Sequence, residues 1–325
     1  MENTRLTLLI CRLAVCLFVI SAVTAQAQTK PADSAASYVN RGNSWFAKGD
    51  LERAIADYNA AIAFDPNEAK AYYNRGCVRQ AKGDLEGALA DYDQAIEINP
   101  YYAAAYNNSG GIFYAHGRLD EAIAACSRAI EINPRYASAY SNRGIAKLGK
   151  GDVDGAIADF NRAIELDRRF ATAYTARGLA RQAKDDTDGA IIDNNQAIAL
   201  NPRLEVAYYN RGNAFFAKND LRGALADFNR AVEINPRFAM AYCNRGSVWV
   251  GLGDLDRAIA DYDQAIKLNS RLIAAYQNRG LARLLLGREA EAEQDFAQCL
   301  ALDSSLKPVI ERLIKETKES MAARK

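Results

Sequence analysis

Asparagine recurs along the chain at a fixed interval of 34 residues, a pattern suited to binding. Ala176 is the single break, and the members are Asn40, Asn74, Asn108, Asn142, Asn210, Asn244 and Asn278. A side-chain amide offers donors and an acceptor, so it can pair with a peptide group whatever side chain that group carries. Two uses are open: a ladder that holds an extended polypeptide, or bonds to neighbouring helix ends that stabilise the array.

Residues that perform catalysis are scarce. The one histidine, His116, stands in a slot where other copies of the repeat carry lysine, so we interpret it as a solvated residue before a turn. A general base, a zinc site or a histidine-activated nucleophile needs more than that. No glycine-rich phosphate loop is present, and the acidic residues fall at repeat positions that structure explains. We therefore predict no enzyme activity, no cofactor, no metal site and no small-molecule substrate.

Arginine and aspartate recur in step with the asparagines. The arginines are Arg41, Arg75, Arg143, Arg177, Arg211, Arg245 and Arg279, and the aspartates are Asp57, Asp91, Asp159, Asp193, Asp227, Asp261 and Asp295. The third copy has Ser109 and Ala125 instead, so both charges are lost together. This joint loss predicts an ion pair between two helices of one repeat. Packing would make it stronger than the ~0–1 kcal/mol of an exposed pair.

A period this strict indicates a stack of small identical units. Eight copies follow one another without a slip, as their tyrosines show: Tyr38, Tyr72, Tyr106, Tyr140, Tyr174, Tyr208, Tyr242 and Tyr276. In the first copy, residues 35–48 carry Trp45 and Phe46 among alanines and no proline, which predicts a helix with one apolar face.

Signals for helix ends also repeat in most copies. Gly49 is placed to end the first helix, because glycine takes the left-handed conformation at no steric cost. Asp185 and Asn219, which tolerate that conformation best after glycine, fill the slot in two other copies. Asp50 then predicts the N-cap of a second helix, and Pro66 disfavours helix in the residue before it.

The predicted second helix, residues 51–64, has a small-large-small face. Ala54 and Ala61 stand seven residues apart with Tyr58 between them, and alanines let two helix axes approach closely. The fifth copy departs most from the pattern, with Ala176, Asn194 and no proline after Asp167. We predict that this copy is the least stable part of the array.

The combined pattern resembles the tetratricopeptide repeat family over residues 35–306. The period of 34, the aromatic at the fourth position, the glycine, the two alanines and the terminal proline all match that family's signature. The resemblance implies an all-α fold, a right-handed superhelical solenoid of antiparallel helix pairs with the first helices on the concave surface. It also implies that the asparagines face this groove, together with Phe46, Tyr73, Tyr114, Tyr209 and Phe216. Such grooves bind a peptide or a partner protein.

Charge and the N-terminal segment bear on the compartment. The 41 basic and 40 acidic residues nearly balance, which disfavours nucleic acid and anionic membranes as partners. Residues 1–27 combine a polar start, an apolar run and Ala25-Gln26-Ala27, as in a secretory signal, and residues 28–34 read as a linker. Arg12 leaves an apolar stretch too short to span a bilayer comfortably, so we predict cleavage and no stable membrane span, with a retained anchor as the alternative. We expect an exported protein, periplasmic or secreted.

Two further features allow more than one reading. An exported protein invites disulfides, yet the four cysteines after the signal share no repeat position, so we predict free thiols: Cys77, Cys126, Cys243 and Cys299. Residues 307–325 predict a helix that caps the last repeat through an apolar stripe, with a partner-binding tail as the alternative. The stripe is Val309, Ile310, Leu313 and Ile314.

Together these features predict a non-catalytic scaffold for protein–protein interaction in a bacterial cell envelope. Its groove would bind an extended peptide or a partner protein. The alternative is an accessory subunit of a larger envelope assembly that uses its convex face or capping helix. A repeat domain attached to an enzyme, such as a sugar transferase, is the third reading, and the sequence offers no segment outside the repeats to house a catalytic domain.

Overall fold

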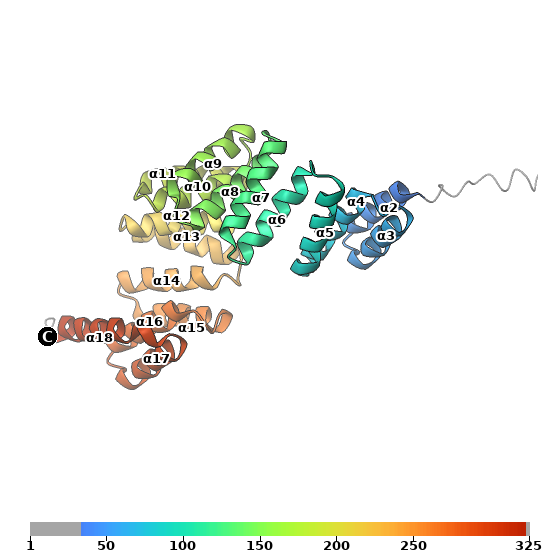
Figure 1. The fold of residues 1–325 in the computed structure, drawn as a ribbon. Helices are drawn as coiled ribbons and strands as arrows, with labels where there is room; N and C mark the ends of the chain where they lie inside the picture. The colour runs from blue at the N-terminus through green and yellow to red at the C-terminus, as the bar shows by residue number, and fades with distance from the viewer. Residues whose placement is uncertain (1–33, 323–325) are drawn as a thin grey trace, which may run out of the picture. The chain divides into compact units, whose positions relative to one another are not determined.

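The computed structural model describes residues 34–322, and all regular structure in that range is helical (Figure 1). The predicted signal and nearly all of the predicted linker lie outside the described residues. The chain divides into two compact units between Ile112 and Phe113. This point falls inside the first helix of the third repeat, Ala103–Ala115.

Each repeat contributes a first helix and a second helix, and in the first repeat these span Ala35–Ala47 and Leu51–Phe64 as predicted. The first helices are α2 (Ala35–Ala47), α4 (Ala69–Ala81), α6 (Ala103–Ala115), α8 (Ala137–Gly149), α10 (Ala171–Gln182), α12 (Glu205–Ala217), α14 (Ala239–Gly251) and α16 (Ile273–Leu285). The second helices are α3 (Leu51–Phe64), α5 (Leu85–Ile98), α7 (Leu119–Ile132), α9 (Val153–Leu166), α11 (Thr187–Leu200), α13 (Leu221–Ile234), α15 (Leu255–Leu268) and α17 (Glu289–Leu302).

The turn between the two helices requires a left-handed residue. Gly49 has φ of 79°, and the two non-glycine residues in this slot, Asp185 and Asn219, have φ of 62° and 60°. The next residue caps the second helix, since the Asp50 carboxylate accepts from the backbone N–H of Arg53. Arg118 occupies the N-cap position of α7, and its side chain makes no capping hydrogen bond to the helix backbone. The predicted turn and N-caps are confirmed.

The second helix ends at an extended Asp or Asn whose side chain accepts from the backbone N–H two residues later, as Asp65 does from Asn67. The sequence reading assigned this stop to proline. Asp167 has the same extended conformation and the same hydrogen bond although Arg168 follows it. The Asp or Asn side chain is therefore sufficient, and proline is not required.

The core of each repeat is the small-large-small face of the second helix. Ala54, Tyr58 and Ala61 are fully buried. Tyr58 lies flat against Gly42 of the first helix, where an added Cβ would come within 2.6 Å of the ring. Only glycine allows this close approach, because a side chain would displace the aromatic ring that fills the interior.

In every repeat but the third, the two helices pack against each other across the short turn, and the second helices α3, α7, α9, α11, α13 and α15 also pack against the next first helix. Within a unit, successive first helices contact one another directly, as α10 does with α8 and α12. The closer approach on the first-helix side places these helices on the inner, concave surface of the stack. We refer to the side-chain surface formed there as the concave face.

A last helix, α18 (Lys307–Ala322), follows the short 3₁₀ turn η1 (Ser304–Leu306) and packs against α16. Ile310 is buried in a cluster with Leu284 and Phe296, and Ile314 packs against that cluster. Val309 is exposed, so its predicted place in the apolar stripe is wrong. The helix turns Ile310 and Ile314, four residues apart, toward α16. In residues 34–322, no helix has the length and apolar character needed to cross a membrane.

Candidate binding surface

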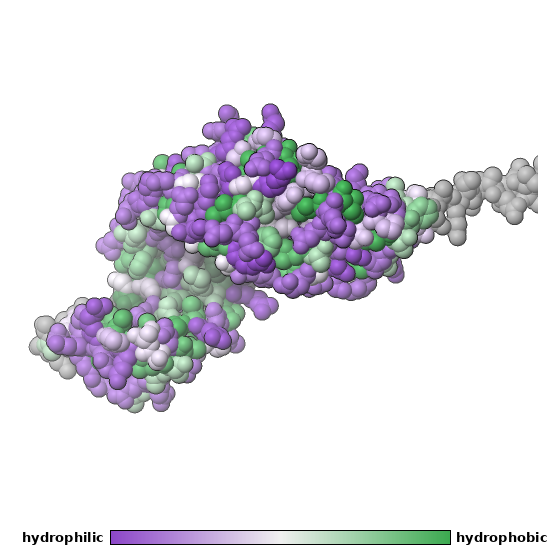
Figure 2. All heavy atoms as spheres, in the orientation of Figure 1, coloured by the Kyte–Doolittle hydropathy of each residue, from purple (hydrophilic) through white to green (hydrophobic). Residues whose placement is uncertain are grey.

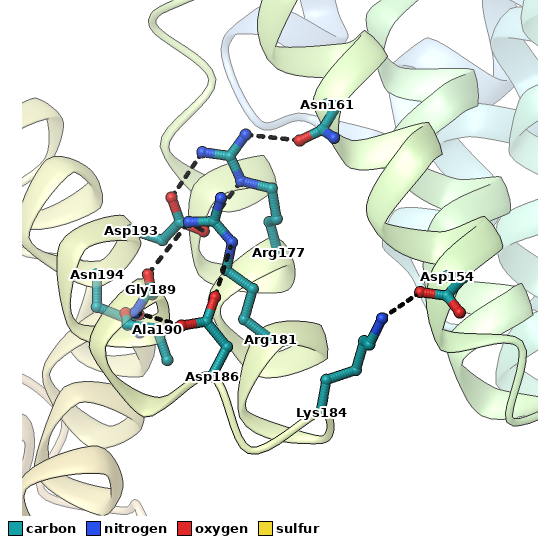
Figure 3. A network of polar contacts seen from close by, with 10 residues as sticks. All are labelled: Asp154, Asn161, Arg177, Arg181, Lys184, Asp186, Gly189, Ala190, Asp193 and Asn194. Carbon is teal, nitrogen blue, oxygen red and sulfur yellow. Dashed lines mark hydrogen bonds and ion pairs between the residues drawn. The ribbon is translucent and has the colours of Figure 1, made fainter.

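All seven predicted Arg–Asp pairs form, with nitrogen–oxygen distances of 2.5 to 2.7 Å. In the fifth repeat, Arg177 of α10 donates two hydrogen bonds to Asp193 of α11 (Figure 3). The Asp193 side chain is 1% exposed and that of Arg177 is 15% exposed. The guanidinium also stacks over the ring of Tyr174, the aromatic of the same repeat.

The arginine also reaches a third helix, which the sequence reading missed. The remaining terminal nitrogen of Arg177 donates a hydrogen bond to Oδ1 of Asn161, on the preceding second helix α9, at 2.7 Å (Figure 3). The same bond recurs at Arg75, Arg143, Arg211, Arg245 and Arg279, to an Asn, Ser or Asp that stands 16 residues before the arginine. We call these residues the clamp arginines, since each fixes two adjacent repeats as well as its own two helices.

Several of the aspartates that pair with clamp arginines also form an ion pair with a second basic residue of the same first helix. Arg181 lies 2.9 Å from Asp193, and Arg283 lies 2.8 Å from Asp295. Lys147 lies 2.8 Å from Asp159. Each of these cations points toward the second helix of its own repeat. Because these basic side chains are neutralised by the aspartates, they add little positive charge to the concave face.

The predicted asparagine ladder makes hydrogen bonds from one repeat to the repeat before it. Asn244 of α14 donates to Oδ1 of Asn213 at 2.7 Å and to the Tyr209 hydroxyl at 3.1 Å, both on α12. Asn278 of α16 donates to Ser247 of α14 at 3.3 Å. These bonds join neighbouring first helices, which differs from the bonds to helix ends considered as the alternative use.

The residue 31 positions earlier decides whether such a bond forms. Asn74 donates to Asn43, and Asn108 donates to the Cys77 sulfur and to the Tyr73 hydroxyl. Asn210 is preceded at that distance by Leu179, and its buried amide makes no side-chain hydrogen bond among the described residues. Asn40, in the first repeat, is exposed, and Asn142 is half-buried.

Three of the four donating asparagines leave their carbonyl oxygens unused, whereas Oδ1 of Asn108 accepts from Asn107. Oδ1 of Asn74, Asn244 and Asn278 accepts no hydrogen bond within residues 34–322 and remains accessible to solvent. The amide hydrogens are thus used for stacking the repeats, while the acceptors stay open on the concave face.

The predicted aromatic residues fall into two groups. Tyr73 and Tyr209 are half-buried between repeats, where Tyr73 packs against Tyr102 at 4.8 Å and Tyr209 against Phe238 at 4.9 Å between ring centroids. Burial raises the pKa of Tyr209. The second group keeps exposed rings at the C-terminal ends of first helices, at Phe46, Tyr114 and Phe216. Exposed aromatic surface therefore lies mainly with this second group.

Two cavities adjoin first helices of the C-terminal unit. One, of about 150 Å³, lies between α14 and α16 and is lined by Ser247, Val250, Tyr262, Asn278, Leu281 and Leu285, among others. The other, of about 320 Å³, lies beside α9 and α10 and is lined by Arg168, Arg177 and Glu165, among others. Arg177 is paired with Asp193 and Glu165 with Arg162, whereas Arg168 forms no ion pair among the described residues.

The described residues offer little for redox or metal chemistry. The four cysteines are free thiols. Burial raises the pKa of Cys126 to about 12 and the pKa of Cys243 to about 11, so both stay protonated at neutral pH. No group of three or more His, Cys, Asp and Glu side chains within residues 34–322 could hold a metal ion. His116 is an exposed residue after α6.

Comparison with known families decides the relationship that the repeat pattern implied. Profiles described as tetratricopeptide repeat match residues 73–137, 206–238, 239–272 and 273–306, and a profile described as TPR repeat matches residues 42–83 and 146–185. The chain belongs to the tetratricopeptide repeat family. Proteins of this repeat class are generally scaffolds for protein–protein interaction. No curated protein matches the sequence significantly.

Solved structures confirm the all-α solenoid of tandem helix pairs. A tetratricopeptide repeat protein from Parabacteroides merdae is 20% identical, with a TM-score of 0.62 over 76% of this chain and 98% of its own. One chain of the crystal structure of the APC/C hetero-tetramer Cut9–Hcn1 is 17% identical to this chain. The TM-score is 0.70, and the match covers 86% of this chain and 55% of the other. Pseudomonas aeruginosa pilF is 18% identical, with a TM-score of 0.55 over 62% and 92%. At these identities the likeness shows the fold alone.

Proposed function

We propose that this protein is a non-catalytic scaffold of the bacterial cell envelope that binds an extended peptide, or an extended segment of a partner protein, on its concave face. The observation that carries the proposal is the pair of open amide acceptors at Asn244 and Asn278 on neighbouring first helices of the C-terminal unit, and Asn74 offers the same open acceptor in the N-terminal unit. A polypeptide in extended conformation presents unpaired backbone N–H groups, and buried N–H groups need acceptors.

Exposed apolar side chains on first helices add to this surface. Phe216 and Val206 lie on α12, and Met240 lies on α14. Figure 2 shows that hydrophilic side chains predominate around α8 to α11 on the face that is drawn there.

A matched pair of substitutions tests the concave face. Phe216 and Ile192 are both exposed apolar residues, the first on first helix α12 and the second on second helix α11. Captures from an envelope fraction with wild-type protein, Phe216→Arg and Ile192→Arg are compared by quantitative mass spectrometry. We expect Phe216→Arg alone to lose a partner that the wild-type protein retains. Loss through Ile192→Arg with retention by Phe216→Arg would refute binding at the concave face.

The alternative function, an accessory subunit that uses its outer face or α18, has its own observation. Ile192 is 64% exposed and Val309 of α18 is 37% exposed. Deleting α18 is a poor test, because it would remove Ile310 and so uncover Leu284 and Phe296, with which Ile310 is clustered. Val309→Asp leaves that cluster covered, so loss of the partner through Val309→Asp would favour this second function.

A further inference from the structure

The smaller cavity, between α14 and α16, combines an apolar wall with a polar floor. Val250, Leu281 and Leu285 form the wall, and Ser247 and Tyr262 belong to the floor. Its volume is about 150 Å³. An apolar cavity of roughly that size accommodates a benzene-sized group.

The two helices that border the cavity present no charge to it. Their charged residues are Arg245 on α14 and Arg279 and Arg283 on α16. All three are bound to aspartates of second helices, Asp261 or Asp295. A charged side chain entering the cavity would lose water without gaining a counter-charge, which is strongly unfavourable.

Hydrogen bonds on the floor fix which polar groups stay available. Asn278 donates to the Ser247 hydroxyl, and that hydroxyl lies 3.2 Å from the Tyr262 hydroxyl. The carbonyl oxygen of Asn278 accepts nothing within the described part of the chain, and the same holds for Asn244 one repeat earlier. The Asn278 oxygen in the cavity lining and the Asn244 oxygen on the preceding first helix are therefore open acceptors that require donors from an occupant.

The spacing of these acceptors fits an extended chain. Packed helices lie roughly 8–10 Å apart, and an extended segment in the polyproline II conformation advances about 9 Å per three-residue turn, so that groups three residues apart point the same way. A segment that places one N–H against Asn244 can place another against Asn278 three residues later. Its side chains then meet successive first helices in the same register.

We propose that the cavity between α14 and α16 is a subsite for one uncharged side chain, of leucine to phenylalanine size, in an extended partner segment whose backbone N–H groups donate to Asn244 and Asn278. The subsite rests on the proposed concave-face function and adds the class of ligand. The bound segment is uncharged around the anchoring residue, which excludes acidic tails and basic peptides as occupants.

The test uses peptides selected on the full chain from a displayed library of random twelve-residue sequences. A peptide of this length spans about four repeats at three residues each. We expect the selected set to be depleted in Asp, Glu, Lys and Arg and to share one large apolar residue. Changing that residue to glycine should weaken binding to the wild-type protein about tenfold, as expected for loss of one buried apolar side chain.

Val250→Phe fills the cavity with an apolar group and keeps the helix surface uncharged. On this variant the original and the glycine peptide should bind with equal Kd. Val250→Ala enlarges the cavity and is the variant to test if Val250→Phe does not fold. It should shift the preferred anchor from leucine toward phenylalanine.

Each outcome separates the subsite from the underlying function. Binding that is lost with Phe216→Arg but shows the same tenfold glycine effect on wild type and Val250→Phe would overturn the subsite and leave the concave-face function standing. Binding that survives Phe216→Arg would overturn both the subsite and the concave-face function. Selected peptides dominated by charged residues, a library that yields no binder, or a self-association of the chain that Val250→Phe abolishes would each overturn the subsite.

Discussion

Asn244 donates its side-chain N–H to the carbonyl oxygen of Asn213 across 2.7 Å, joining the first helix of one repeat to the first helix of the repeat before it. The pair has two consequences. It stabilises the interface between α12 and α14, and it leaves Oδ1 of Asn244 open to a ligand. Asn244 is therefore both structural and available for binding, and the two roles belong to different atoms of the same amide.

The structural role predicts unequal effects of alanine at two ladder positions. Asn244→Ala removes two hydrogen bonds between repeats and should lower the free energy of unfolding by about 1–2 kcal/mol. Asn210→Ala removes no side-chain hydrogen bond within residues 34–322 and should cost less than half as much. Urea unfolding followed by circular dichroism measures both. Equal midpoints for the two variants would contradict the assigned bonds.

The clamp predicts a larger effect at Asp193. Asp193→Ala leaves Arg177 partly buried without its counter-charge and should destabilise the protein by about 3–5 kcal/mol. Asp188→Ala is the matched control on the same helix. Its ion pair with Lys218 is exposed, and its loss should cost at most about 1 kcal/mol. Comparable losses at both sites would show that the clamp is no stronger than a surface pair.

The fifth repeat predicts a gain of stability from one substitution. Asn194 is fully buried at a position where six of the other seven repeats have an aromatic residue, and its Oδ1 has no hydrogen-bond partner among the described residues. Asn194→Phe would place a ring against Gly178, as Phe160 lies against Gly144, and should raise the free energy of unfolding by about 1–3 kcal/mol.

Hydrogen exchange provides the companion measurement for that repeat. Amides of α11 should exchange faster than those of α9 in the wild-type protein, and Asn194→Phe should slow them. Exchange in α11 that is as slow as in α9 would dispose of the prediction that this repeat is the weakest.

The N-terminal segment predicts a processed product. Protein recovered from the envelope of a bacterial host should begin at Gln28, because Ala25-Gln26-Ala27 supplies small residues at the cleavage positions. Intact-mass measurement distinguishes this form from the full chain. A membrane-bound product that keeps residues 1–27 would support a retained anchor instead.

Features that depend on neighbouring residues in the chain were predictable. The turn at Gly49, the cap at Asp50 and the helix that follows each have a local cause, so the sequence is enough to find them. The Arg–Asp pair was found through its joint loss at Ser109 and Ala125, and the structure confirms it in the seven repeats that carry it.

Contacts between repeats were missed, since they depend on how one helix pair is rotated against the next. The bond from Arg177 to Asn161 is one example, although a polar residue 16 positions before each clamp arginine is a signal that could have revealed it. The position of Val309 is another, because a stripe of four apolar residues does not specify which of them faces α16.

The central claim is that the concave face binds a partner segment, and site-specific photocrosslinking tests it most directly. A benzophenone amino acid replaces Phe216 on α12 in one protein and Ile192 on α11 in another, each expressed in a bacterial host with the full chain intact. We predict that irradiation joins a partner polypeptide to the protein labelled at Phe216 and not to the one labelled at Ile192. Crosslinking from Ile192 alone would contradict the account.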